Sequence, residues 1–540
     1  MPEKKEIEYY TWADKIVGEL KNRDVKEHIL HGMWTPSGYF HIGNARNELM
    51  APLLVHDALG DAGVKSVFNF FIDDFDDLDK IPAGTDVPEG FEKNLGHPLH
   101  KVPSPSPGRD SWSDFFSAEL LEVIDKLGKR PKIYSSYKEY HKGTYDNAIR
   151  IVLNNWQKAR DIWIKTTKTQ KPKDWIPVMP ICENCGRGAM TVATEWNGET
   201  LKYSCSQNRP YAESCGYGGE FVPEKGRVKL PWRLHWPATW FTFRTTFESG
   251  GKDHFASGGS VDTGRIFSRE IFKYEPPILL RGDFVTVDGK KISGSEGNVV
   301  SLKDWLGIAE PELLRFIYIS YQPSVVIEFD ISSNKFFLLT DRYDDAERCY
   351  FGEHSTTEKR TEHLKRQYRL AQITKPPEEQ PVRISYSMLV MLLQVVPNKS
   401  AKSISNLLFK MGTIKKELEK EDMERLERRI RFAENWLNKY AHEEAKIKIN
   451  EAVPLNLAAE LTEEEKSSMH ELDEKIGKLN TESELQSEIY EIARRNNIEP
   501  KRFFRILYNL LLNRDSGPKL GPFILATGKE KVSKLLEDVR

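Results

Sequence analysis

The chain has 540 residues, of which 39% are hydrophobic and 30% are charged, and its formal net charge is −2. One hydrophobic core does not serve a chain of this length, so we expect about three or four domains. The near-zero charge excludes nucleic-acid binding driven by overall charge and leaves local basic patches for that role. The start, MPEKKEIEYY, lacks an apolar signal segment, and no stretch approaches the ~18 apolar residues of a membrane span. We therefore expect a cytoplasmic protein with no membrane partner.

The amino-terminal part alternates between strand and helix signals. Residues 25–34 (VKEHILHGMW) predict a strand, TPSG predicts a turn, and residues 42–63 predict a helix. A second strand is expected over residues 65–73 (KSVFNFFID). Strand, turn, helix and strand in this order are typical of the start of a nucleotide-binding α/β unit.

The rest of the chain changes character twice. A proline-rich break (VPSPSPG, residues 102–108) precedes two helical segments and a cysteine-rich region, and a second α/β portion spans roughly residues 230–306. After Pro311 the pattern is helical to the end of the chain. Within this part, the apolar run MLVMLLQVV (residues 388–396) predicts a buried helix.

The stretch TPSGYFHIGN combines a tight turn with the start of a helix. Free backbone N–H groups and the positive end of the helix dipole converge there, which is typical of a phosphate site. His41 and Asn44 lie one helical turn apart and present donors to the same phosphate oxygens, while Gly38 and Gly43 allow close backbone approach. The alternative is a plain helix cap with an exposed histidine. The position at the first strand-to-helix crossover favours the phosphate site.

The stretch GKKISGSEGN carries the second candidate phosphate group. Lys291 precedes a run of small residues, and Ser293 and Ser295 add hydroxyl donors without bulk. By itself this pattern fits a surface hairpin better. Its place in a second α/β half, about 250 residues after His41, makes it the natural partner of the first motif.

Four of the five cysteines cluster in the middle of the chain, at Cys182, Cys185, Cys205 and Cys215. A CxxC pair followed by two further cysteines suits a tetrahedral thiolate site for Zn²⁺. The alternatives are buried free thiols or a disulfide, which a cytoplasmic protein disfavours.

A basic stretch near the carboxyl terminus, from Arg494 to Lys519, is interleaved with aromatic residues. Basic side chains contact phosphates and exposed rings stack on unpaired bases, so this stretch is a candidate RNA surface. Alternatively, the aromatic rings are helix core and the arginines form a solvated face. The pattern does not decide between the two. The candidate contacts are Arg494, Arg495, Arg502 and Arg505, with Phe503, Phe504 and Tyr508 between them.

These motifs together resemble a known family. HIGN and KISGS resemble the two signatures of class I aminoacyl-tRNA synthetases, and the whole chain resembles the archaeal-type class I lysyl-tRNA synthetases. Gly294, where most class I enzymes carry a second lysine, is specific to the lysine group. The matching segments are TWADKIV, TPSGYFHIGN, DDFDDLDKIP, LPWRLHWPATW, GKDH, DTG, KISGSEGN, ELLRFIYI, NWLNKYA and GPKLGPF.

The resemblance implies a division of the chain. It predicts a Rossmann-type catalytic domain split into residues 1–100 and 230–332, around an inserted domain with a four-cysteine zinc module at residues 101–229. A helical connector at residues 333–380 and an α-helical anticodon-binding domain at residues 381–540 complete the chain.

The resemblance also implies the chemistry: lysine attacks ATP, with Mg²⁺ on the phosphates, and the lysyl group passes to tRNA(Lys). Catalysis then consists of positioning and charge stabilisation, for which His41, Asn44 and Lys291 are the candidates. The resemblance assigns amino-acid contacts to Thr35, His254 and Asp283, and a structural role to Zn²⁺. The implied ATP contacts are Thr35, Pro36, Gly38, His41, Gly43, Asn44, Asp253, Lys291, Ser293 and Ser295.

The amino-acid pocket departs from the family pattern. Gly282-Asp283-Phe284 stands where the family has Tyr-Glu-Phe, Met33 replaces a small residue, and His235 replaces an aspartate. Glu296 occupies a place where the family usually has a lysine, which predicts weaker ATP binding.

These departures leave three alternatives beside a lysine enzyme: a paralogue for another amino acid, a non-catalytic tRNA-binding paralogue, and a metabolic nucleotidyltransferase. The intact phosphate motifs argue against the second. The zinc insertion and the long helical part argue against the third.

Overall fold

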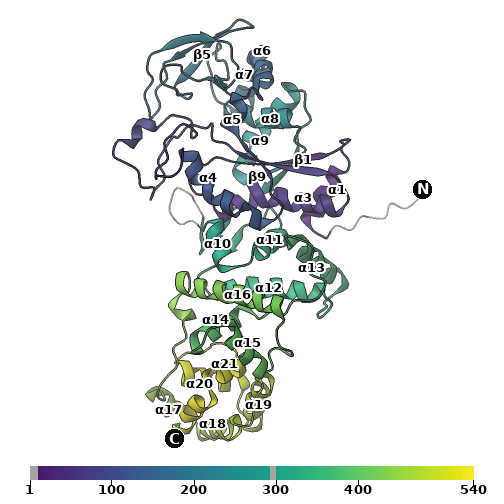
Figure 1. Cartoon of the computed structure of the whole chain (residues 1–540), viewed down its shortest axis with the longest axis vertical. Helices are drawn as coiled ribbons and strands as arrows, with labels where there is room; N and C mark the ends of the chain where they lie inside the picture. The colour runs from purple at the N-terminus through teal and green to yellow at the C-terminus, as the bar shows by residue number, and fades with distance from the viewer. Residues whose placement is uncertain (1–9, 292–299, 540) are drawn as a thin grey trace, which may run out of the picture. The chain divides into compact units, whose positions relative to one another are not determined.

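The computed structural model describes residues 10–291 and 300–539, and within these ranges the side chains of Lys291 and Ala458 are not described. The chain folds into two compact units (Figure 1). The first consists of Met1–Leu306, Pro311–Phe329 and Ser355–Pro376, and the second of Gly307–Glu310, Asp330–His354 and Pro377–Arg540. All the strands of the described residues belong to the first unit.

The centre of the first unit is a five-stranded sheet in which every pairing is parallel. Its three central strands are almost continuously buried, as expected when helices cover both faces of a parallel sheet. In spatial order the strands are β10 (Ile278–Gly282), β9 (Phe247–Gly251), β1 (His28–Trp34), β2 (Ser66–Ile72) and β3 (Lys132–Ser135). β1 and β2 confirm the two strands predicted near the amino terminus.

The predicted helix of residues 42–63 is present but not regular throughout. It starts as α2 (Ile42–Asn44), continues as the π-helical turn η1 (Ala45–Met50) and ends as α3 (Ala51–Asp61). A π turn accommodates one extra residue per turn and changes the direction in which the following side chains point.

Helices cover both faces of the sheet. α3 contacts β1, β2 and β9 on one side, with α1 (Trp12–Leu20) beside it, whereas α8 (Trp232–Phe243) and α9 (Ser260–Glu270) lie on the other side (Figure 1). Further helices of this unit are α4 (Trp112–Val123), α5 (Ser136–His141), α6 (Asp146–Asn154), α7 (Trp156–Thr167), α10 (Leu302–Ile308), α11 (Pro311–Ser320) and α13 (Glu358–Ala371).

The cysteine region forms small sheets of its own between β3 and α8. One contains β5 (Thr191–Trp196), β6 (Leu201–Cys205) and β7 (Gly218–Phe221), and another pairs β4 (Met179–Pro180) with β8 (Val228–Lys229). Apolar side chains of this region share one buried cluster with side chains of α6 and α8, so the inserted strands pack continuously onto the helices beside them.

A three-stranded sheet carries the chain toward the second signature. β11 (Val285–Val287) pairs antiparallel with β12 (Lys290–Lys291) and parallel with β13 (Ile327–Phe329). The hairpin turns at Asp288 and Gly289, both with positive φ, as a tight two-residue hairpin requires. The prediction that the chain is purely helical after Pro311 is wrong at β13, because three residues suffice to extend a sheet whose other strands lie upstream.

The second unit is helical in the part of the chain that the structure describes. The predicted helix of residues 388–396 is confirmed as α14 (Tyr386–Val395), and most of its residues are buried. The other helices are α12 (Lys335–Tyr350), α15 (Ala401–Lys410), α16 (Lys420–Lys439), α17 (Leu455–Glu460), α18 (Glu463–Ile476), α19 (Glu482–Arg495), α20 (Pro500–Leu512), α21 (Leu520–Thr527) and α22 (Lys529–Glu537). No helix of the described residues has the length and apolar character to cross a bilayer. The five-part division of the chain stays a prediction.

Arg315 on α11 is a fully buried charge that ties several elements of the first unit together. Its guanidinium pairs with Asp57 at 2.5 Å and donates to the carbonyl oxygens of Leu127, Leu370 and Ala371 at 2.8–2.9 Å. A buried guanidinium is stable only when its donors are satisfied in this way.

Arg315→Leu leaves three buried carbonyls without a donor and Asp57 without its cation. We expect the free energy of unfolding to fall by about 3–5 kcal/mol, measured by urea denaturation. Arg130 is the control, because its exposed guanidinium pairs with an equally exposed Asp125 at 2.6 Å. Arg130→Gln should cost less than about 1 kcal/mol, and equal losses in the two variants would contradict a special role for Arg315.

Candidate functional site

The candidate site lies where the order of strands in the main sheet changes direction. From β1 the chain proceeds to β2 and β3 on one side, and β9 and β10 lie on the other. Ligands of such sheets bind outside the carboxyl ends of the strands at this switch point. A cavity of about 510 Å³ lies there, lined by Met33, Trp34, Thr35, Ser37, Gly38, Tyr39, His41, Asn44, Glu48, Asp76, Lys80, Trp232 and His254.

His41 and Asn44 form a reciprocal cap at the start of α2. The backbone N–H of Asn44 donates to Nδ1 of His41 at 3.1 Å, and the backbone N–H of His41 donates to Oδ1 of Asn44 at 3.4 Å. Burial lowers the pKa of His41 to about 4. The imidazole is therefore neutral near pH 7, and because Nδ1 accepts, its proton is on Nε2. A Cβ on Gly43 would meet this ring at 2.9 Å, so the packing requires glycine.

The structure brings the two signature segments together. The backbone N–H of Ile42 donates to the carbonyl of Val300 at 3.0 Å, and His41 forms a β-bridge with Ser301. β12 delivers the chain from the other end, with Lys291 paired to Thr286. Both ends of the second signature are thus held near the first. The side chain of Lys291, together with Ser293, Ser295 and Glu296, lies outside the described residues.

Arg46, on the π turn, links the first signature to the chain that leads into the second. Its buried guanidinium donates five hydrogen bonds of 2.7–3.1 Å, all to backbone carbonyls. Two of these carbonyls belong to residues 283–284, directly before β11, and three belong to residues 322–325. Carbonyl dipoles therefore replace a carboxylate as the partner of this charge.

Glu48 places a carboxyl group in the same cavity. Its Oε2 atom is buried and has no hydrogen-bond partner among the described residues. Burial raises the pKa of Glu48 well above its usual value, and a side-chain hydrogen bond with Asn44 opposes this shift only in part. A buried acid without a cation, in a cavity, is a candidate binding group for a cationic ligand. Glu48 was not among the residues predicted from the sequence. It lies four residues after Asn44 in the predicted helix, and this spacing would have placed both side chains on the same face.

The side of the cavity next to β2 is acidic and is held by a buried lysine. Thr35 Oγ1 donates to Asp76 at 3.2 Å, and the ammonium of Lys229 bonds the other oxygen of Asp76. Lys229 is almost fully buried, and the carboxylates around it raise its pKa despite burial. Thr35 is thereby fixed at the end of β1, in the cavity wall. Pro36 lies in the turn that follows.

Comparison of the whole chain with known proteins places it among the synthetases. Residues 10–374 match the family described as tRNA synthetases class I (K). The chain belongs to this family. A Lysine–tRNA ligase from Pyrococcus horikoshii is 34% identical over 536 residues, spanning 97% of this synthetase and 99% of the relative. A Lysine–tRNA ligase from Methanocaldococcus jannaschii is 32% identical over 535 residues, spanning 96% and 98%.

The predicted amino-acid residues of this synthetase take different positions. His254 lines the cavity, packed near Trp232 and Trp236 with ring centroids 5.8 and 5.3 Å away, and burial lowers its pKa. Asp283 does not line the cavity, and its carboxylate pairs with Lys252 at 2.7 Å. Asp253 and Lys252 belong to the short 3-10 helix Lys252–Phe255 that follows β9.

The three residues that depart from the family pattern, Met33, Gly282 and His235, lie in different surroundings. Met33 lines the cavity. Gly282 faces Asn47, whose amide oxygen would lie 1.7 Å from a Cβ at this position, so Asn47 occupies the space where a larger side chain would stand. His235 is fully buried and away from the cavity lining, with Tyr140 Oη 2.8 Å from its Nδ1.

The four clustered cysteines of the synthetase converge as the sequence predicted. Their sulfur atoms all lie within 4.8 Å of one another, with Cys182 3.6 Å from Cys215 and Cys185 3.8 Å from Cys205. Hydrogen bonding, first of all from the side chain of Asn184, lowers the pKa of Cys215 to about 6. Four thiols at this spacing, one of them readily ionised, fit a tetrahedral zinc ion.

The basic stretch of the second unit contains both core rings and paired charges. Phe503 is fully buried and Tyr508 donates to the carbonyl of Pro518 at 2.9 Å, which favours a core role for these rings. Phe504 is half-buried, 4.6 Å from the ring of Tyr490. The four candidate arginines pair with carboxylates: Arg494 with Glu491, Arg495 with Glu471 and Glu488, Arg502 with Glu465, and Arg505 with Asp515. A role of these arginines in tRNA binding stays a prediction.

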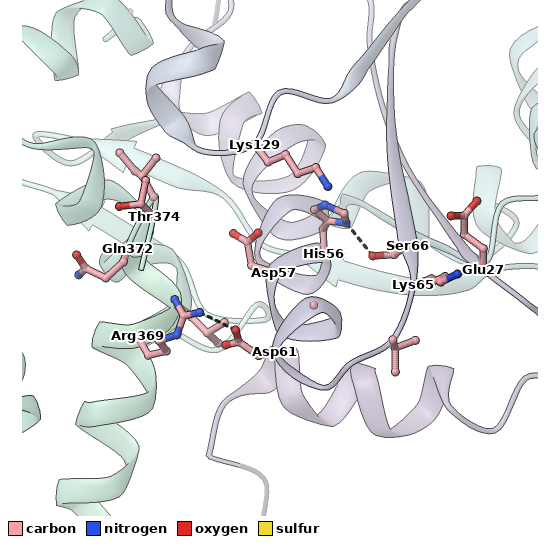
Figure 2. Close-up of a pocket in the computed structure, with 14 residues that line it drawn as sticks. Glu27, His56, Asp57, Asp61, Lys65, Ser66, Lys129, Arg369, Gln372 and Thr374 are labelled. Atoms are coloured by element: carbon pink, nitrogen blue, oxygen red, sulfur yellow. Dashed lines mark hydrogen bonds and ion pairs between the residues drawn. The ribbon is translucent and has the colours of Figure 1, made fainter. Parts of the chain in front are cut away.

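A second cavity of about 420 Å³ lies at the opposite ends of the strands of the main sheet (Figure 2). Figure 2 shows His56 beside Ser66, with 2.7 Å between Nδ1 and Oγ, and Arg369 paired with Asp61. Ser66 begins β2, so this cavity faces the amino ends of the strands. It lacks the helix start that marks the first cavity.

Arg46→Lys replaces five directed hydrogen bonds by at most three. We expect faster amide hydrogen exchange in a peptide covering residues 283–291, because the carbonyls that fix this segment lose their partners. Arg265→Lys, an exposed change on α9, is the control and should leave exchange in that peptide unchanged. Unaltered exchange in the Arg46 variant would show that the segment is held by other contacts.

Proposed function

We propose that this synthetase is a lysine–tRNA ligase. The carboxylate of lysine attacks the α-phosphate of ATP, giving lysyl-adenylate and pyrophosphate. A hydroxyl of the terminal adenosine of tRNA(Lys) then takes the lysyl group, and AMP is released. The observation that carries the proposal is one cavity that joins a phosphate-binding helix start with a buried carboxyl group that lacks a cation. The relatives named Lysine–tRNA ligase, which match almost the whole chain, support the same assignment.

In the activation step the described residues bind and orient ATP. The neutral imidazole of His41 donates from Nε2 to a phosphate oxygen, and the positive end of the helix dipole adds to this. The sequence suggested free N–H groups at this helix start, but those of Ile42 and Asn44 already donate to Val300 and His41. Asn44 Oδ1 accepts in the cap and the Asn44 side chain also hydrogen-bonds Glu48, so its amide N–H₂ keeps one N–H for the same oxygens. Lys291 supplies positive charge from the second signature, and Mg²⁺ bound to ATP would offset part of the charge on the phosphates. No side chain serves as a nucleophile, because the substrate carboxylate does.

Glu48 is the group we assign to the ε-ammonium of lysine. An ammonium that enters a partly buried pocket needs an anionic partner, and Glu48 is a carboxyl group of the cavity whose pKa burial has raised. The predicted partner, Asp283, already pairs with Lys252 outside the cavity lining. Trp232 and His254 line the cavity with Glu48 and are placed to contact the rest of the amino acid.

The remaining roles follow from the same proposal. Zn²⁺ on Cys182, Cys185, Cys205 and Cys215 is structural, because these residues tie together strands of the inserted region and line no part of the cavity. The helical unit binds tRNA through Arg494, Arg495, Arg502 and Arg505, whose exposed ion pairs are weak enough to exchange for phosphates. The protein acts in the cytoplasm, as a translation enzyme does.

ATP–pyrophosphate exchange with each of the twenty amino acids, with and without tRNA, tests the proposal. We expect exchange with lysine alone. Lys291→Ala should abolish it while leaving tRNA affinity nearly unchanged, because Lys291 acts on ATP phosphates; Lys290→Ala, one residue earlier on β12, is the matched control. Exchange with another amino acid would mark a paralogue, and no exchange with any would favour a non-catalytic tRNA-binding protein.

Glu48→Gln removes the charge that we assign to lysine recognition and keeps the shape. Lysine binding should weaken by about 2–5 kcal/mol, seen as a higher KM for lysine, with the KM for ATP little changed. Because burial raises the Glu48 pKa and lysine needs the ionised acid, the wild-type KM for lysine should fall as pH rises toward that pKa, and Glu48→Gln should lose this trend. Asp283→Asn is the comparison, and a larger loss there would assign the ammonium to Asp283 instead.

A further inference from the structure

We propose that the end of α12 is a second metal site, formed by Asp345, Cys349 and His354, for a first-row divalent cation of the zinc type. The ligand atoms of these three side chains all lie within 4.8 Å of one another. Among the described residues, only this group and the four clustered cysteines bring three or more such side chains together so closely. The new site lies in the second unit and does not depend on the function proposed above.

The local backbone explains why the three side chains meet. Asp345 and Cys349 are four residues apart on α12, so they lie on the same face one turn apart. The helix ends at Tyr350, and Gly352, with φ of 79°, lets the chain reverse. The backbone N–H groups of Glu353 and His354 then both donate to the carbonyl of Arg348, at 2.9 and 3.3 Å. This reversal returns His354 to the face that carries Asp345 and Cys349.

The three donors suit zinc by their chemistry. A thiolate, an imidazole and a carboxylate are the side chains that Zn²⁺ binds, and three protein ligands leave a fourth position for water. Cys349 is buried, whereas the side chains of His354 and Asp345 are 46% and 32% exposed. A metal ion could therefore enter from the solvent side, between Asp345 and His354, and would be coordinated by the buried sulfur of Cys349.

The separation of the ligands also fits a shared ion better than direct pairing. Nε2 of His354 lies 3.7 Å from Oδ1 of Asp345, too long for a hydrogen bond but compatible with two groups on one cation. Arg348 pairs with the same Asp345 oxygen at 3.2 Å. This ion pair is half-exposed and belongs to the weak class of surface pairs, so a divalent ion displaces the guanidinium.

The test measures zinc stoichiometry and affinity on the full-length protein, by equilibrium dialysis against Zn²⁺ followed by elemental analysis. The wild-type chain should bind two ions, one at the four cysteines and one at α12. His354→Gln should bind one ion tightly and the second more than about 100-fold more weakly, because the loss of an outer-shell partner alone already costs about 10- to 100-fold. His470→Gln, an exposed histidine on α18, is the matched control and should keep two ions.

Cobalt substitution gives an independent readout that does not rely on activity. Co²⁺ at the α12 site would have one thiolate ligand. Cys349→Ser should therefore remove the thiolate-to-cobalt charge-transfer absorption of this site and leave that of the four-cysteine site unchanged. Because Cys349 is buried and its replacement alters packing, the exposed His354 variant remains decisive. One ion in the wild type, or two ions retained in His354→Gln, overturns the proposal.

Discussion

The guanidinium of Arg46 is the constraint on which the arrangement of the candidate cavity depends. Arg46 lies shortly after the start of α2, yet its hydrogen bonds end on carbonyls that are 237–279 residues later in the chain. Five carbonyl dipoles satisfy the charge, so Arg46 needs no acid as its partner at the proposed phosphate site. The helix start at His41 and the hairpin that leads into the second signature are thereby held together.

The π turn that carries Arg46 also sets the directions of its neighbours. Within η1, Arg46 reaches the segment before β11, Asn47 fills the space at Gly282, and Glu48 enters the cavity. Three consecutive side chains thus point in three different directions and contact three different parts of the first unit. A π turn persists in a helix only when surrounding contacts hold it, and these contacts are of that kind.

The cavity keeps its polar groups in unusual protonation states, and one physical cause explains this. Burial lowers the pKa of His41 to about 4, so the imidazole is neutral near pH 7, and burial raises the pKa of Glu48 well above its usual value. Close by, burial and the neighbouring Asp76 raise the pKa of Asp73 to about 7. A charged substrate meets His41 and Glu48 without first breaking an ion pair of theirs, and in a low-dielectric wall each new contact is strong. The pair of Asp283 and Lys252, by contrast, satisfies itself away from the cavity.

The sequence by itself determined the periodic and local features. The alternation of residues 25–73 predicted β1 and β2, the TPSG turn predicted the helix start at His41, and the cysteine spacing predicted four converging sulfurs. These follow from side-chain period, turn chemistry and metal geometry, which act over short stretches of chain. Only the tertiary structure decided the position of Glu48 in the cavity, the pairing of Asp283 with Lys252 and the burial of His235. The surroundings of each of these three side chains depend on which distant segment packs against it, and the local sequence pattern carries no information about that packing. The π turn at residues 45–50 and the strand β13 belong to the same class, because contacts from far along the chain, and not intrinsic propensity, stabilise them.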